Sequence, residues 1–283
     1  GNNRGYVRDY ARVIGTIDSA SGIYRILFDG NLVANGTSSL LRAVNTTFLI
    51  PHCFKGNHNV TLHDDVTKAN ASTYFTVYTK YYIEAIMPPQ QTQLMEGQST
   101  TIRVNVTGGE PNTSLLANAT VKLPEPVNTV YYNSSLQLVN TTRSGEYLAE
   151  SIYPRDFGIG AHTNYNGTYN IYFNATPTFT SALASGNFTV GLTSTTEFHR
   201  YGTVAIQGAD YTQQDEKVWI NITSAGKTVF STNVNATGGI VNANWTIPWN
   251  ATIRKYTIKI TNSTSPGTIK PIPDIQNFTI TSA

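Results

Sequence analysis

The segments YFTV (residues 74–77), NFTV (187–190) and NFTI (277–280) repeat one short pattern, in which an aromatic residue is followed by threonine and an aliphatic residue. Alternating runs precede all three copies, and alternation with period two is typical of a β-strand with one buried face. Each run and the copy after it therefore predict two antiparallel strands joined by a polar loop. The preceding runs are HNVTL (58–62), YNIYF (169–173) and YTIKI (256–260).

The spacing of these copies sets the number of domains. The copies begin 113 and 90 residues apart, which matches the length of an immunoglobulin-type sandwich. The first and last parts of the chain also share a strand that ends at Ile-Pro, because TFLIP (47–51) resembles NWTIP (244–248). We predict an all-β fold of three tandem immunoglobulin-like β-sandwich domains. Their predicted ranges are 1–86, which includes an N-terminal segment, 87–198 and 199–283, with a stiff proline hinge at 87–90.

Charge excludes some classes of partner. Charged residues make up only 13% of the chain, and the formal net charge is +2, which gives no electrostatic basis for binding nucleic acid or an anionic membrane. No run approaches the roughly 18 consecutive apolar residues of a membrane-spanning helix. Because the sequence starts at Gly1, we expect that a leader has been removed.

The chain has one cysteine, Cys53, so no intrachain disulfide can form. We expect Cys53 to be a small buried apolar residue. The alternative is a reactive or intermolecular thiol. In either case the three domains depend on side-chain packing for their stability.

The acceptor pattern for N-glycosylation, Asn-x-Ser/Thr, is the most frequent motif. It includes 18 of the 27 asparagines, about three times the roughly five or six that chance would supply. This density predicts a secreted glycoprotein, and each occupied acceptor must face water. The acceptors are Asn35, Asn45, Asn59, Asn70, Asn105, Asn112, Asn118, Asn133, Asn140, Asn166, Asn174, Asn187, Asn221, Asn235, Asn244, Asn250, Asn262 and Asn277.

Strand periodicity and acceptor positions agree. In the run 101–106 the alternation turns Ile102, Val104 and Val106 inward and Asn105 outward. A glycan on Asn105 would then extend into solvent.

Several segments resemble the immunoglobulin-like repeats of archaeal surface glycoproteins. They are IYRILFDGNLV (23–33), the Ile-Pro turn, the closing strand and MEGQS (95–99). The resemblance covers essentially the whole chain at the level of fold. It implies surface-layer proteins, secreted filament subunits or adhesins, and it brings no catalytic residues.

The N-terminal segment has two interpretations. Residues 11–17 form a run of high β-propensity that reads as the first strand of domain 1. The alternative is a donor strand, residues 1–17, that completes a sheet in another subunit. In that hypothesis the assembly contacts are Ala11, Val13, Ile14 and Ile17.

Motifs for catalysis are absent from the sequence. It contains neither a Gly-x-Ser-x-Gly elbow nor a Gly-rich phosphate loop. Glu146 and Glu150, on one predicted strand, would lie about 13 Å apart, too far for a glycosidase pair. We predict no enzyme and no catalytic, cofactor or metal site. The weaker alternatives are a metal site near His58, His63, Asp64 and Asp65, and a Ca²⁺ site near Asp210, Asp215 and Glu216.

Together these patterns predict a structural subunit of an extracellular, glycosylated assembly at the cell surface. Its partners would be copies of itself in a head-to-tail, pilus-like filament or a surface-layer array, with covalent N-glycans, no nucleic acid and no membrane insertion. The alternative is an adhesin or carbohydrate-binding surface module. Its ligand would meet the loop 154–166, near Tyr153, Phe157, His162 and Tyr165.

Overall fold

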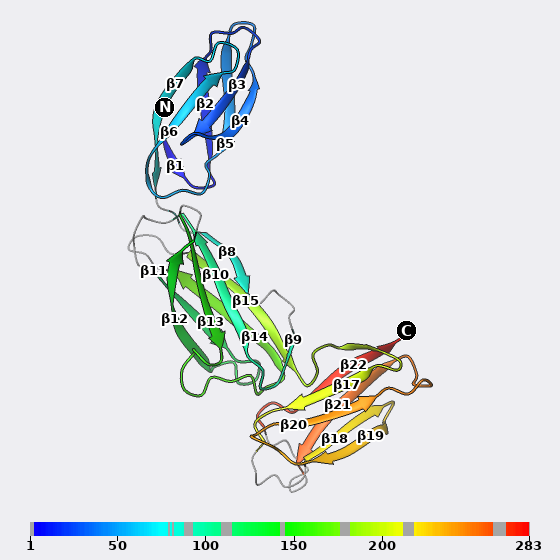
Figure 1. Cartoon of the computed structure of the whole chain (residues 1–283). Helices are drawn as coiled ribbons and strands as arrows, with labels where there is room; N and C mark the ends of the chain where they lie inside the picture. Colours follow the sequence, from blue (N-terminus) through cyan, green and yellow to red (C-terminus); the bar gives the residue numbers. More distant parts are fainter. Residues whose placement is uncertain are drawn as a thin grey trace.

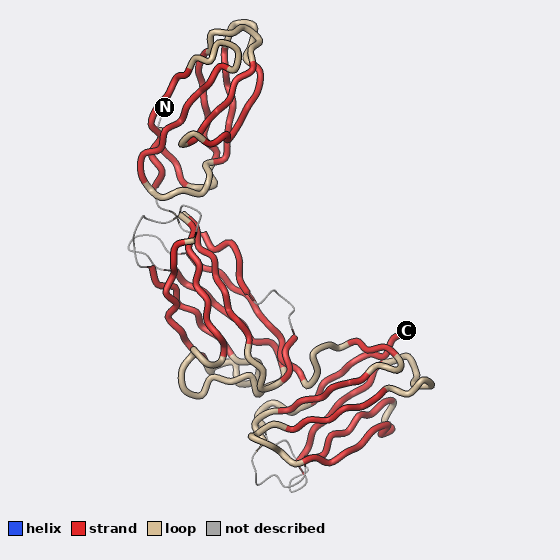
Figure 2. The backbone as a smooth tube through the Cα atoms, viewed as in Figure 1, coloured by secondary structure: helices blue, strands red, loops and turns tan. Residues whose placement is uncertain are grey.

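The computed structural model describes residues 3–78, 80, 82–87, 93–108, 115–141, 145–175, 182–211, 218–262 and 270–282. These residues form strands, turns and loops (Figure 2). Three β-sandwiches follow one another along the chain (Figure 1). The predicted fold class, all-β with three tandem immunoglobulin-like sandwiches, is confirmed. In the described ranges no helix is long and apolar enough to cross a membrane.

Domain 1 packs a five-stranded sheet against a two-stranded sheet. Its strands are β1 (Arg4–Tyr6), β2 (Tyr10–Thr16), β3 (Ile23–Phe28), β4 (Asn31–Thr37), β5 (Ala43–Leu49), β6 (Gly56–Asp64) and β7 (Asn70–Tyr78). The larger sheet has the order β1-β7-β6-β3-β4, and β2 pairs with β5 in the smaller one. β1 runs parallel to β7, whereas the other pairs are antiparallel.

Domain 3 repeats this arrangement. Its strands are β16 (Glu197–His199), β17 (Thr203–Gly208), β18 (Val218–Ser224), β19 (Lys227–Val234), β20 (Val241–Thr246), β21 (Lys255–Asn262) and β22 (Ile275–Thr281). The larger sheet has the order β16-β22-β21-β18-β19, and β17 pairs with β20. β1 begins opposite Thr76 and β16 begins opposite Thr279. The repeated segments 74–77 and 277–280 therefore occupy the same place in two sandwiches.

Domain 2 lies between them and has a single run of eight strands, in the order β8-β10-β13-β12-β11-β14-β15-β9. β9 is parallel to β15, as β1 is to β7. β12 joins the two halves, pairing with β11 over residues 131–138 and with β13 at Val139 and Asn140. The bounds are β8 (Tyr82–Met87), β9 (Gln93–Met95), β10 (Thr100–Thr107), β11 (Leu115–Lys122), β12 (Tyr131–Asn140), β13 (Glu146–Tyr153), β14 (Gly167–Ala175) and β15 (Ala182–Gly191).

Both junctions differ from the predicted ranges by a few residues. β8, which was expected to end domain 1, pairs with β10 of domain 2. β16 begins at Glu197 and pairs with β22 of domain 3. Sequence patterns mark strands but not their partners, and the partner decides to which domain a strand belongs. The predicted hinge falls mostly on residues 88–90, outside the described residues.

Each domain has its own apolar core, built from alternate strand positions. In β10, Ile102, Val104 and Val106 are fully buried, while Arg103 is exposed and Asn105 is half-buried. Domain 1 also contacts domain 2 directly, because Phe54 packs against the core of domain 2.

Cys53 lies in the core of domain 1 and is 5% exposed. Burial, with a smaller effect from the negative charge of Asp29, raises the pKa of the Cys53 thiol to about 12. The thiol is therefore protonated at neutral pH and shielded from reagents. This agrees with the interpretation of Cys53 as a structural residue.

Removing core volume should destabilise domain 3. Ile258 is fully buried in β21, and the neighbouring Lys259 is exposed. Ile258→Ala should lower the free energy of unfolding by about 2–5 kcal/mol, since it removes buried methyl groups and leaves a cavity. Chemical denaturation of the full chain measures this. Lys259→Ala is the matched control and should shift stability by less than about 0.5 kcal/mol.

Cys53 should resist modification in the folded protein. At pH 8 a chromogenic disulfide reagent should leave the thiol unreacted, because the thiol is both protonated and buried. In denaturant the same reagent should titrate one thiol per chain. Rapid reaction without denaturant would contradict the structural role.

Candidate functional site

The residues predicted as assembly contacts lie in the smaller sheet of domain 1 or next to it. β2 pairs with β5 along its whole length. Ala11 and Ile17 are buried in the core, Val13 is half-buried, and Ile14 is 70% exposed. The structure thus places the segment as a strand of its own domain. Ala11 and Ile17 of this segment pack in the core of domain 1, and the donor-strand interpretation of residues 1–17 stays a prediction.

An open groove follows the other edge of β2. Its volume is about 780 Å³, and it lies between β2 and the strands β1 and β7. Within the described ranges β2 pairs only with β5, so the backbone groups on its second edge face the groove. The apolar part of its lining includes Ala11, Phe48, Ile50, Val60, Leu62 and Phe75.

The inner face of β7 is also uncovered. Ala71 and Thr73 line the groove and are exposed, although they lie on the side of the strand that faces the smaller sheet. In a sandwich, positions of this kind are normally covered by the opposing sheet. The groove therefore has the geometry of a missing strand: a free edge beside an apolar surface.

Domain 2 shows how such an edge is covered. β10 has β13 on one edge and β8 on the other. β8 directly follows the closing strand of domain 1 in sequence and pairs with residues 103–107 of β10, with one bulge. The segment that leaves domain 1 thus supplies a strand to domain 2.

Domain 3 is covered by a shorter segment of domain 2. The β2–β5 ladder of domain 1 corresponds to the β17–β20 ladder of domain 3 when both are aligned from their first residue pairs. In this alignment Gln207 of β17 corresponds to Ile14 of β2. The backbone N–H of Gln207 donates to the carbonyl of Leu192 at 2.8 Å, and Leu192 is fully buried in the core of domain 3. Leu192 follows β15, the closing strand of domain 2.

The inner face of β22 is covered by the same segment. Gln276, which corresponds to Thr73 in domain 1, is 7% exposed. Its Oε1 accepts the backbone N–H groups of Leu192 and Thr193, and its Nε2 donates to Thr193 Oγ1 at 2.7 Å. In domains 2 and 3 this position is therefore filled by residues that precede the domain. In domain 1 no described residue fills it.

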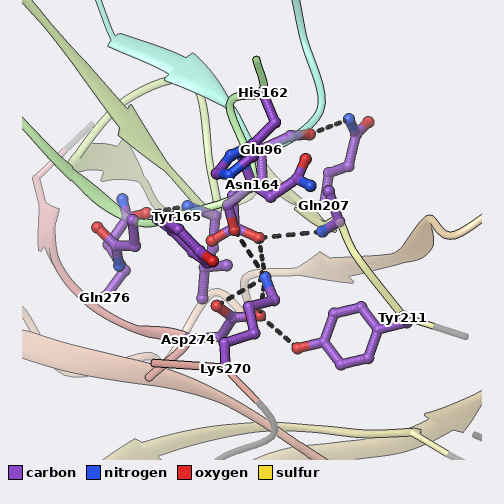
Figure 3. A network of polar contacts seen from close by, with 12 residues as sticks. Glu96, His162, Asn164, Tyr165, Gln207, Tyr211, Lys270, Asp274 and Gln276 are labelled. Atoms are coloured by element: carbon purple, nitrogen blue, oxygen red, sulfur yellow. Dashed lines mark hydrogen bonds and ion pairs between the residues drawn. The ribbon is translucent and has the colours of Figure 1, made fainter. Parts of the chain in front are cut away.

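A buried polar network holds domain 2 to domain 3 (Figure 3). Lys270 Nζ lies 2.6 Å from Glu96 Oε2 and 2.8–2.9 Å from both carboxylate oxygens of Asp274. It also donates to the backbone carbonyl of Asn164 at 2.9 Å, and Tyr211 donates its hydroxyl hydrogen to Asp274. The side chains of Glu96, Lys270 and Asp274 are 0–3% exposed.

The electrostatics of this network are unbalanced. One lysine faces two carboxyl groups in a site without exposed surface. Burial, followed by the negative charge of Asp274, raises the pKa of Glu96 well above its ordinary value. Glu96 Oε2 accepts the backbone N–H of Ala209 at 3.0 Å, whereas its Oε1 is buried and has no hydrogen-bond partner among the described residues.

The glycosylation acceptors lie on outward positions wherever their side chains are described. Asn105, Asn166, Asn187 and Asn221 are half-buried, and none of the described acceptors is buried. Asn112, Asn140 and Asn262 fall outside the described side chains. The exposed ones are Asn35, Asn45, Asn59, Asn70, Asn118, Asn133, Asn174, Asn235, Asn244, Asn250 and Asn277.

The loop 154–166, the ligand-binding candidate of the adhesin alternative, has its aromatic side chains turned inward. Tyr153 and Phe157 are 0% and 2% exposed in the core of domain 2. His162 and Tyr165 are half-buried and contact each other edge to face, 4.7 Å between ring centres. The loop forms hydrogen bonds with other residues of domain 2 and with Lys270 and Ile275 of domain 3. The loop is part of the joint between domains.

The two weaker metal candidates do not converge. His58 Nδ1 lies 2.6 Å from Asp29 Oδ2, while His63 Nε2 lies 3.3 Å from Asp65 Oδ1. Asp64 accepts backbone N–H groups, which lower the pKa of its carboxyl group. In the part of the chain that the structure describes, no three His, Cys, Asp or Glu side chains could hold one ion. Residues 215 and 216 lie outside that part.

The network at the joint was not predicted from the sequence. Glu96 and Lys270 are 174 residues apart, and neither stands in a motif. The one available signal was the rarity of charge in this chain, which makes each charged residue between apolar neighbours worth attention.

Comparisons with known proteins find likeness only among solved structures. No protein-family model matches the chain, and no curated protein matches it. Bacteroides ovatus mixed-linkage glucan utilization locus SGBP-B, in complex with a mixed-linkage heptasaccharide, is 14% identical, with a TM-score of 0.29 over 99% of this chain. An ICAM-5 ectodomain fragment is 11% identical (TM-score 0.30, 99% of this chain and 74% of that one), and a titin I-band fragment is 10% identical (TM-score 0.22, 99% and 95%).

The chain spans 65% of the length of the SGBP-B chain. Identities and TM-scores at this level carry no argument about function. The resemblance to archaeal surface glycoproteins stays a prediction.

Proposed function

We propose that this chain is a non-catalytic structural subunit of an extracellular, glycosylated assembly, in which copies join head to tail. The observation that carries the proposal is the open groove beside β2. The corresponding position is filled by β8 in domain 2 and by Leu192 in domain 3. Because equivalent sites in domains 2 and 3 are filled by segments from the preceding domain, the groove of domain 1 is suited to a segment of the same kind.

The proposed occupant is the end of domain 3 in a second copy of this chain. Both internal fillers follow the closing strand of the domain before them, β7 for β8 and β15 for Leu192. By the same rule a filler for domain 1 comes from the residues at the end of β22 or beyond it. A contact between two different surfaces that repeats without closing generates a filament.

The acceptor asparagines support an extracellular location. Those with described side chains lie on outward or half-buried positions, where glycans would be solvated and would block sideways pairing between sheets. The adhesin alternative has less support, because the aromatic side chains proposed for its ligand are packed within domain 2 or against the joint.

A charge placed in the groove should abolish assembly. Thr73 is exposed on the inner face of β7, and Tyr74 is exposed on the outer face. Thr73→Arg should leave the chain folded but dispersed, because a strand entering the groove would bury an unpaired guanidinium group. Tyr74→Arg should assemble like the unchanged protein. Negative-stain electron microscopy of all three proteins measures this, with circular dichroism to confirm folding.

The outcomes separate the parts of the proposal. Filaments formed by Thr73→Arg would show that assembly uses another surface. Dispersed three-domain particles of the unchanged protein, under conditions that preserve its glycans, would refute the assembly function itself.

Occupancy of the acceptors should differ between sites. Asn166 donates from Nδ2 to the backbone carbonyl of Ile275 at 2.7 Å, across the joint. A glycan attaches to that nitrogen and would collide with domain 3, so Asn166 should be largely unoccupied. Asn45 and Asn244 are exposed and should carry glycans. Glycopeptide mass spectrometry of the native protein decides, and full occupancy at Asn166 would contradict the packing of the joint.

A further inference from the structure

The network between domains 2 and 3 brings an amine into contact with two carboxyl groups in a dry site. Lys270 Nζ is 2.6 Å from Glu96 Oε2 and within 2.9 Å of Asp274. Glu96 lies in the turn between β9 and β10 of domain 2, and Lys270 precedes β22 of domain 3 (Figure 3). Side chains at these distances are within reach of a condensation reaction.

The network is not a requirement of the fold. Domain 1 has the same strand order, and aligning the β1–β7 and β16–β22 ladders makes Ala71 the residue of β7 that corresponds to Asp274. Burying three ionisable side chains costs free energy that apolar residues would not cost. Their presence at this one joint therefore calls for a chemical explanation as well as a structural one.

We propose that Lys270 and Glu96 form an intramolecular amide (isopeptide) bond that covalently joins domain 2 to domain 3. Three features of the site suit this reaction. Glu96 Oε2 is held by the backbone N–H of Ala209 at 3.0 Å, which polarises the carboxyl group. Glu96 Oε1 is buried and has no partner in the described part of the chain, as fits an oxygen that leaves. Asp274, held by Tyr211, contacts Lys270 on its other side and can accept a proton.

Charge balance sets the starting state. With one ammonium and two carboxyl groups in a buried site, one carboxyl group must be neutral. In the proposed starting state Glu96 is that group, because its side chain is 0% exposed and because burial and the adjacent Asp274 raise its pKa. A neutral carboxylic acid is the form that an amine can attack, since its hydroxyl group can leave as water.

The proposed step conserves atoms and charge. Lys270 Nζ transfers one proton to the Asp274 carboxylate and attacks Cδ of protonated Glu96. The new C–N bond forms as the bond from Cδ to the hydroxyl oxygen breaks. Of the three protons of the ammonium group, one stays on the amide nitrogen, one is held by Asp274, and one leaves with the hydroxyl group as water. No oxidant or other reactant is needed.

The mass of the denatured full chain tests the proposal. The chain is produced in a bacterial cytoplasm, where N-glycans are not added, and purified in its folded form. We expect a mass lower than that of the sequence by one water molecule. Digestion with chymotrypsin should release a branched peptide that contains both Glu96 and Lys270. A missed tryptic cleavage after Lys270 is not diagnostic, because Lys270 precedes Pro271 and trypsin does not cut that bond in either form.

Two variants serve as controls. Lys270→Arg keeps the positive charge but should show the full mass, because a guanidinium group does not condense with a carboxyl group. Asp274→Asn keeps the shape but should also show the full mass or react more slowly, because the proton acceptor is lost. Circular dichroism establishes that each variant is folded.

Two results of the mass measurement would overturn the proposal. A folded, unchanged chain that retains the full mass after prolonged incubation shows that the network is an ion pair only. A loss of water whose branched peptide joins Lys270 to Asp274 would overturn the assignment to Glu96.

Discussion

A strand edge without a partner, next to an uncovered sheet face, is the constraint on which this molecule depends. A sandwich whose smaller sheet has two strands leaves part of the larger sheet uncovered. Exposed apolar surface and free backbone groups then favour the addition of another segment. Domain 2 meets this need with β8 and domain 3 with Leu192. Domains 1 and 2 are therefore each followed by a segment that covers the open strand edge of the next domain along the chain.

The joint between domains 2 and 3 combines this completion with an unusual concentration of charge. The chain has few charged residues, yet Glu96, Lys270 and Asp274 meet in a site that water does not reach. The loop 154–166 packs against the same place. A joint with this many directional contacts resists bending. Cys53, the single buried thiol, takes no part.

The alternation of strand residues also determines where the glycan acceptors lie. Acceptors occur on outward or half-buried positions wherever side chains are described, because the alternation that buries one residue exposes the next. Glycans in these places would cover polar faces and leave the groove of domain 1 as an accessible apolar surface. The groove contains a free strand edge, which proteins usually protect.

The sequence by itself determined the strands, the repeated closing segments at 74–77 and 277–280, and the inward positions of residues such as Ile102 and Val104. These features depend on the alternation of apolar and polar residues, which can be recognised in the sequence of a single strand. It did not determine the partner of β8, the open edge of β2, or the meeting of Glu96 with Lys270. A strand's neighbours and a contact between residues 174 positions apart depend on how whole sheets pack. Only the tertiary structure decides them, since hydrogen bonding at a strand edge carries no sequence signature of its partner.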